Sequence, residues 1–166
     1  MHMKFLAPLA AGMLVAAVAP ALAATKTATM SVSATVLASC NVSAANLAFG
    51  NYDASAPLTG SADVTVFCSK GTPYTVLLST GGGTFAQRLL ANGANKLQYN
   101  LFTTSGLNKV WGDGTASSDM LSGTGKGLSS SNGNTHTIYG QLPNSTANQD
   151  APVGNYTDTI TVTVSY

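Results

Sequence analysis

The amino-acid sequence predicts an all-β sandwich of the immunoglobulin type, on three observations. Short runs in which apolar and polar residues alternate recur along the chain, turn-forming Gly and Asn residues separate them, and helix-forming residues are scarce beyond the first 23 positions. Strict alternation places one set of side chains on each face of an extended strand, so each run can bury one face against a common core. The chain beyond those positions is the size of one domain.

The N-terminal residues 1–23 have the pattern of a secretory signal peptide. Lys4 provides a positive charge, residues 5–19 form an apolar stretch that is short and alanine-rich for a membrane span, and Ala21-Leu22-Ala23 has the small residues of a cleavage site. No later apolar run has membrane length. The mature chain is therefore expected to begin at Ala24 and to be exported without membrane insertion.

The first alternating run follows directly behind this signal. Its apolar positions are Ala28, Met30, Val32, Ala34 and Val36. Two interpretations are open. Residues 28–36 are the first strand of the domain itself, which patterning alone favours, or residues 24–37 are a mobile extension that fills a groove in the next copy of the protein by β-strand addition.

Further strands are expected at a spacing typical of a sandwich. They cover residues 40–49, 62–68, 74–79, 96–103, 135–142 and 156–166. The best helical candidate is 85–91, and the Ser/Gly-rich stretch 115–134 is expected to be a long surface loop. The last strand is the clearest and ends with the chain at Tyr166, so we expect the sheet edge beside it to need a partner.

The two cysteines, Cys40 and Cys68, both lie in the exported part. In an oxidising compartment such a pair is expected to form a disulfide. The bond would close a loop of roughly 29 residues and contribute about 3–4 kcal/mol in the chain-entropy model. A redox or metal pair is disfavoured because the C-x-x-C spacing and a nearby His are both lacking.

The charged residues give no sign of a nucleic-acid or anionic-membrane partner. After removal of the signal, six basic side chains balance six acidic ones, all of which are Asp. The charges are scattered along the sequence, whereas such partners require a basic cluster.

No catalytic, metal or cofactor motif is present. His136 is the one histidine beyond the signal, and a triad of Ser131, His136 and Asp150 would lack a positioning motif such as G-x-S-x-G, so a surface or edge-strand histidine is favoured. Asp113 is expected in a turn, because the EF-hand pattern is missing. Trp111 and Tyr52 offer one alternative, a self-complete secreted sandwich that stacks carbohydrate on these rings.

Several motifs together resemble one family across nearly the whole mature chain. They are Cys40-Asn41-Val42, Phe49-Gly50-Asn51-Tyr52-Asp53, Val64-Thr65-Val66-Phe67-Cys68, Gly71-Thr72-Pro73-Tyr74, Leu97-Gln98-Tyr99-Asn100-Leu101-Phe102, Trp111-Gly112-Asp113-Gly114 and the ending from Gly154 to Tyr166. In this order they resemble the spore coat protein U domain family, which includes subunits of archaic (Csu-type) chaperone–usher pili. Other members are spore-coat and surface proteins, so a spore-coat-type surface protein is also open.

The resemblance implies an incomplete immunoglobulin-like fold over residues 38–166 that lacks its last strand. In the family, a periplasmic chaperone lends a strand to the subunit, and an outer-membrane usher exchanges it for the N-terminal extension of the incoming subunit. Carried onto this chain, the donor positions would be Met30, Val32, Ala34 and Val36, with Ala28 marginal, and Cys40 and Cys68 would form the family's bridge. The acceptor groove and the chaperone-binding edge would include Ile160, Val162, Val164 and Tyr166. The implied function is donor-strand exchange into cell-surface fibres for adhesion and biofilm formation.

Overall fold

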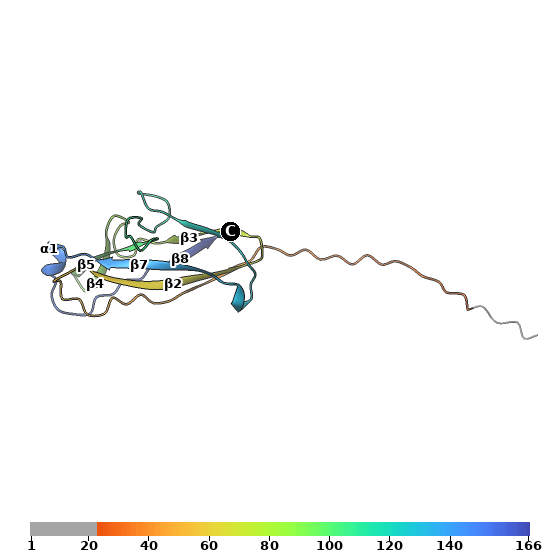
Figure 1. Cartoon of the computed structure of the whole chain (residues 1–166), viewed down its shortest axis with the longest axis horizontal. Helices are drawn as coiled ribbons and strands as arrows, with labels where there is room; N and C mark the ends of the chain where they lie inside the picture. Colours follow the sequence, from red (N-terminus) through yellow and green to blue (C-terminus); the bar gives the residue numbers. More distant parts are fainter. Residues whose placement is uncertain (1–22) are drawn as a thin grey trace, which may run out of the picture. The chain divides into compact units, whose positions relative to one another are not determined.

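The computed structural model describes residues 23–166, and the predicted signal peptide lies outside them except for Ala23. The described chain is all-β, with two antiparallel sheets and only two short helices (Figure 1). The elements are β1 (Cys40–Ala44), β2 (Leu58–Cys68), β3 (Pro73–Leu78), β4 (Arg88–Asn92), β5 (Asn95–Phe102), β6 (Leu121–Thr124), the 3-10 helix η1 (Ser130–Asn132), β7 (Asn134–Leu142), α1 (Thr146–Gln149) and β8 (Val162–Ser165). No helix among the described residues is both long and apolar enough to cross a membrane.

The two sheets have the orders β1-β2-β7-β5-β4 and β6-β3-β8. The longest pairing joins β2 to β7, from Leu58 opposite Leu142 to Val66 opposite Asn134. β3 pairs with β6 on one side and β8 on the other. The arrangement is an immunoglobulin-like β-sandwich, as the alternation predicted.

The core fills the space between the sheets with the inward positions of the alternating runs. Val64, Val66 and Cys68 of β2 face the same core as Val76 and Leu78 of β3, and all are at most 1 % exposed. Each such side chain stabilises the fold by about 1.5–3 kcal/mol, as an upper estimate. The core therefore depends on the period-two pattern.

A buried arginine crosses this core at the start of β4. Arg88 is 0 % exposed. Its Nε and Nη2 atoms donate to the carbonyl oxygen of Ser79 at 3.1 and 2.8 Å, and Nη2 also donates to that of Trp111 at 2.7 Å. Nη1 donates to Oδ1 of Asn100 at 2.7 Å. The guanidinium thus joins the turn after β3, the strand β5 and the segment around Trp111.

Three expected elements differ from the structure. Residues 85–91 do not form a helix, because residues from Arg88 onward pair with β5 in a hairpin whose turn has Gly93 at φ +60°. The stretch 115–134 is not a single loop, because it contains β6 and η1. The strand expected over 40–49 ends at Ala44.

The last expected strand is also shorter than its alternation. Only Val162–Ser165 pairs in a sheet ladder, whereas residues 156–166 alternate. The Asp158 carboxylate accepts hydrogen bonds from the backbone N–H groups of Gly82 and Thr159, at 2.9 and 2.7 Å. The Gly82 bond holds the chain before β8 to the turn after β3, and an isolated backbone bridge between Thr157 and Ala91 holds it to β4. This part of the segment is therefore tethered by separate contacts and not by a continuous ladder.

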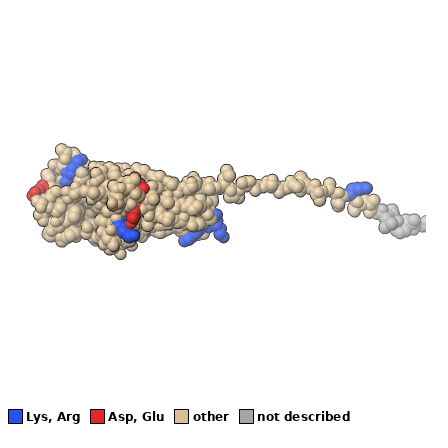
Figure 2. All heavy atoms as spheres, turned by 90° about the horizontal axis from the view of Figure 1, so that it is seen from above, with Lys and Arg blue, Asp and Glu red and all other residues tan. Residues whose placement is uncertain are grey.

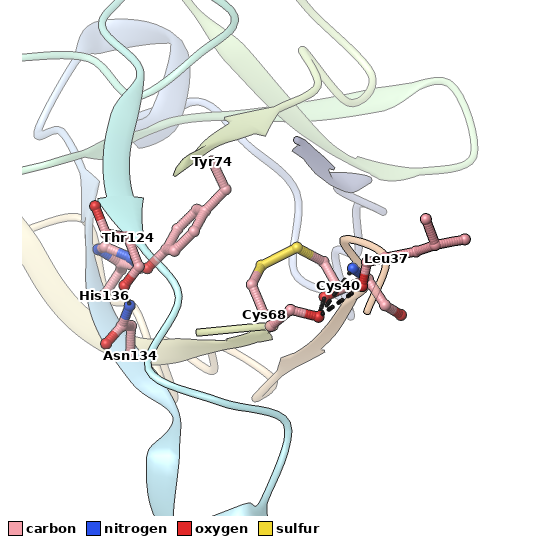
Figure 3. The surroundings of a disulfide bond; sticks show 9 residues. Leu37, Cys40, Cys68, Tyr74, Thr124, Asn134 and His136 are labelled. Carbon is pink, nitrogen blue, oxygen red and sulfur yellow. Dashed lines mark hydrogen bonds between the residues drawn. A yellow bond between two sulfur atoms is a disulfide. The ribbon is translucent and has the colours of Figure 1, made fainter. Parts of the chain in front are cut away.

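The disulfide joins the first residue of β1 to the last residue of β2 (Figure 3). Cys40 and Cys68 are register partners, with Cα atoms 4.1 Å apart. Just beyond the bond, the Ser39 backbone N–H donates to the Ser69 hydroxyl at 3.1 Å, and that hydroxyl donates to the Leu37 carbonyl at 3.3 Å. The point at which the N-terminal segment leaves the sandwich is therefore fixed both covalently and by hydrogen bonds.

Candidate functional site

An apolar groove of about 1020 Å³ opens into the sandwich core. Its floor consists of inward side chains of β5 and β7. They are Leu97, Tyr99, Leu101, Ile138 and Leu142. Two chain segments, 44–54 and 151–162, border it on either side. These floor side chains are themselves only 2–7 % exposed, so the groove ends on core positions of β5 and β7.

The first border is the irregular segment after β1. Leu47 and Phe49 are partly buried against the core, and the Phe49 ring meets that of Tyr99 edge-on at 6.1 Å. Gly60 and Gly140 face each other across β2 and β7, and a Cβ at Gly140 would lie 2.8 Å from the Phe49 ring. The segment approaches the sheet because Gly140 has no side chain, whereas a Cβ at Gly60 would be 3.5 Å from its nearest neighbours.

The second border is the C-terminal segment that leads into β8. Ile160 and Val162 line the groove, and Val162 and Val164 pack against the core with Leu78 and Val76 as their register partners on β3. Among the described residues, β8 pairs with β3 on one side and with no strand on the other. Its outer edge therefore offers backbone N–H and C=O groups to a further strand.

The four C-terminal positions expected at an acceptor groove are thus not equivalent. Ile160 and Val162 line the groove, and Val164 packs against the core outside the groove lining. Tyr166 is 62 % exposed and also lies outside the lining. The floor residues of β5 and β7 and the Leu47–Phe49 border were not among the expected site residues. Their inward alternation is visible in the sequence, but it marks core positions in general.

The polar part of the groove lining includes one hydrogen-bonded pair, Tyr99 and Asp158. The Tyr99 hydroxyl donates to Oδ2 of Asp158 at 2.5 Å. Burial, reinforced by this hydrogen bond, raises the pKa of Tyr99 far above its ordinary value, so the phenol remains a donor at every physiological pH. The pair joins the floor of the groove to its C-terminal border.

The expected donor positions lie in the segment before the sandwich. Residues 23–39 form no helix or strand, and the side chains of Met30, Val32 and Val36 are 84–89 % exposed. Residues 28–36 therefore do not supply the first strand of the described domain, which begins at Cys40.

Two of the candidate stacking and catalytic residues, Trp111 and His136, pack inside the sandwich. Trp111 is 0 % exposed, and its indole Nε1 donates to the Val76 carbonyl at 3.0 Å, so it offers no stacking surface. His136 is neither on the surface nor on an edge strand. It is partly buried on β7, where its Nε2 lies 2.9 Å from the Tyr74 hydroxyl (Figure 3). Its ring also meets that of Trp111 edge-on. Among the described residues, no group of three or more His, Cys, Asp or Glu could hold a metal ion.

The environment of His136 predicts a pH-dependent stability. Burial lowers the pKa of His136, so the unfolded chain takes up a proton first as the pH falls below about 6.5. As the pH is lowered from about 6.5 to the pKa of His136 in the folded state, the free energy of unfolding should fall. Above about pH 6.5, this histidine should have no effect on it. Urea midpoints between pH 7.5 and 5.5 measure the slope. His136→Gln should flatten it, and an unchanged slope in that variant would rule this origin out.

Fold and groove together define an immunoglobulin-like sandwich with an exposed hydrophobic groove beside a free strand edge. The chain belongs to the Spore Coat Protein U domain family, whose model matches residues 26–163. Among solved structures, it is similar to a chain in the crystal structure of the CsuC–CsuE chaperone–tip adhesion subunit pre-assembly complex from archaic chaperone–usher Csu pili of Acinetobacter baumannii. The TM-score is 0.55 and the identity 25 %, over 80 % of this chain and 41 % of that one. No curated protein matched.

Proposed function

We propose that this protein is a chaperone–usher pilus subunit that polymerises by placing residues 24–37 in the groove of another copy. The observation that carries the proposal is the presence, in one chain, of an exposed alternating apolar segment and an open apolar groove beside a free strand edge. The family and the pilus-subunit complex among its structural relatives support it.

The donor segment offers apolar side chains to the apolar floor of the groove. Alternate residues Ala28, Met30, Val32, Ala34 and Val36 would face the floor, while the backbone would extend the sheet beyond β8. Burial of Met30, Val32 and Val36 contributes about 1.5–3 kcal/mol each as an upper estimate, and each ladder hydrogen bond about 0.5–1.5 kcal/mol net. Ordering the segment costs about 1–2 kcal/mol per residue, so the complex depends on a dry, well-packed groove.

The position of the chain ends favours one direction of insertion. β8 is antiparallel to β3, with Ser165 opposite Thr75, so the C-terminal end of β8 lies at the disulfide end of the sandwich (Figure 1). The N-terminal segment leaves from this same end, at Ser39. A donor parallel to β8 would bring the donating subunit to the disulfide end of the acceptor, where the acceptor's own N-terminal segment leaves. An antiparallel donor places successive subunits at opposite ends, as a linear fibre requires.

The proposal assigns roles to the partners of such a pathway. Before assembly, the open groove exposes apolar surface and strand edge, which favour aggregation. A periplasmic chaperone would cover both by lending a strand, and an outer-membrane usher would exchange that strand for the donor of the incoming subunit. The product would be a surface fibre that serves adhesion and biofilm formation.

Deletion of residues 24–37 tests the proposal. The truncated chain keeps its groove and loses its donor, so with its chaperone and usher it should form no fibres alone. Mixed with full-length protein, it should accept one donor and terminate the chain, which shortens fibres in proportion to its fraction. Electron microscopy and sedimentation measure both effects. Fibres of normal length from the truncated chain alone would contradict the proposal.

A further inference from the structure

A short connection constrains where the donating subunit must sit. This inference rests on the proposed function. Between Val36, the last donor position, and Cys40, the first residue of β1, lie only Leu37, Ala38 and Ser39. Four residue steps span at most about 14 Å when fully extended. The disulfide end of the donating subunit must therefore lie close to the end of the groove that it fills.

The disulfide end of the sandwich is basic. The Gly71 N–H donates to the Gly125 carbonyl and the Gly127 N–H to the Cys68 carbonyl, at 2.8 and 2.9 Å. These bonds hold the exposed Lys70 and Lys126 in neighbouring turns beside the disulfide. On the face drawn in Figure 2, basic side chains occur at this end of the sandwich without acidic ones beside them.

The opposite end of the groove carries carboxylates. Asp53 lines the groove mouth, where the N–H and hydroxyl of Ser55 donate to its Oδ1 at 2.9 and 2.8 Å. These hydrogen bonds lower the pKa of Asp53, which keeps it ionised. The Ser55 carbonyl accepts from Asn144 at 3.0 Å, which joins this turn to the chain leading into α1, where the exposed Asp150 caps the helix.

The same end has two further features that bear on a contact. The Val153 side chain is 101 % exposed and lines the groove mouth, and it gives this surface an apolar centre. Lys96 also lies nearby, on the hairpin whose Gln98 bonds to Asn148 of α1. Its charge faces the donor's lysines unfavourably, so the attraction depends on Asp53 and Asp150.

We propose that Lys70 and Lys126 of a donating subunit dock against Asp53 and Asp150 of the accepting subunit. The partner is a second copy of this chain, and the contact is separate from the inserted strand. Its role is to hold adjacent sandwiches in a defined orientation about the short connection. Exposed charge pairs are weak one by one and are screened by salt, so the contact adjusts fibre geometry and lifetime while the strand supplies the main attachment.

Carbodiimide cross-linking of fibres assembled from equal amounts of ¹⁴N- and ¹⁵N-labelled protein tests the contact without any mutation. This reagent joins lysine to carboxylate only where they touch. Mixed-isotope peptides that link Lys70 or Lys126 to Asp53 or Asp150 are expected. The pair of Lys109 and Asp119, 3.7 Å apart within one subunit, is the internal control. Fibres that give the control cross-link and no mixed cross-link at these positions overturn the contact and leave the proposed function intact. Failure to form fibres overturns both.

Charge reversal provides a second measurement. The variant K70E/K126E should dissociate from fibres about three- to tenfold faster at low salt, and the difference should vanish near ~1 M salt. Lys109→Glu is the control: it loses only an exposed ion pair within one subunit, with Asp119, so it should leave the dissociation rate unchanged. Equal dissociation rates for the double variant and wild type at low salt would contradict the contact.

Discussion

Val32→Asp is expected to lower the rate of fibre growth by at least about a hundredfold. In the proposed assembly the residue 32 side chain enters an apolar groove, where an unpaired carboxylate loses its hydration without gaining a partner. In the free chain Val32 is 84 % exposed, so the substitution should leave the folding of the sandwich unchanged. Fibre growth is followed by light scattering and electron microscopy, and stability by thermal unfolding.

The neighbouring residue supplies a matched control for this prediction. Ser33 lies in the same segment with its side chain on the opposite face of an extended strand, so Ser33→Asp introduces the same charge towards solvent. Its fibres should grow within about threefold of the wild-type rate. If both substitutions slowed fibre growth equally, the added charge alone would explain the effect, and the insertion of one face of the segment into the groove would be contradicted.

Arg88→Ala is expected to lower the free energy of unfolding by about 3–5 kcal/mol. The substitution removes the donor from one buried acceptor, on Trp111, and from two partly buried ones, on Ser79 and Asn100, and it creates a cavity. Burial lowers the pKa of Arg88 although the nearby Tyr99 and Asp158 oppose the shift, and the guanidinium remains charged. Urea denaturation measures the loss.

Two further variants separate these causes. Arg88→Lys keeps the charge but cannot reproduce the planar fork of donors, so it should recover only part of the loss. Lys96→Ala removes an exposed cation from the same hairpin and should change stability by less than about 0.5 kcal/mol. A loss below about 1 kcal/mol for Arg88→Ala would show that the three carbonyl groups find other donors.

Local patterning was sufficient for the strands that bury one face. β2, β3, β5 and β7 lie where alternation predicted them. In such a strand, a shift of register by one residue would turn every apolar side chain from the core to the solvent, so the pattern determines the strand. It failed for β4, where the pairing with β5 and the distant acceptors of Arg88 decide the structure. β6 lies in a Ser/Gly-rich stretch with almost no alternation, and its pairing with β3 is long-range.

The groove could be predicted only in part. Alternation drew attention to Ile160, Val162 and Val164, and these lie together on the core side of the C-terminal segment. The opposite border depends on the close approach of Phe49 to Gly140, two residues that are far apart in the sequence. Short-range patterns contain no information about such an approach.

The disulfide at the start of β1 also determines how a pulling force would travel through the sandwich. Tension applied along the N-terminal segment reaches Cys40 and crosses directly to Cys68, at the end of β2. The ring of residues between the two cysteines is bypassed, so the short edge strand β1 cannot be peeled from its neighbour one hydrogen bond at a time. In a fibre, the tension would pass from the donor segment of a subunit, through the disulfide, into the turn between β2 and β3 of the same subunit. The segment 44–54, which borders the groove, would carry no tension.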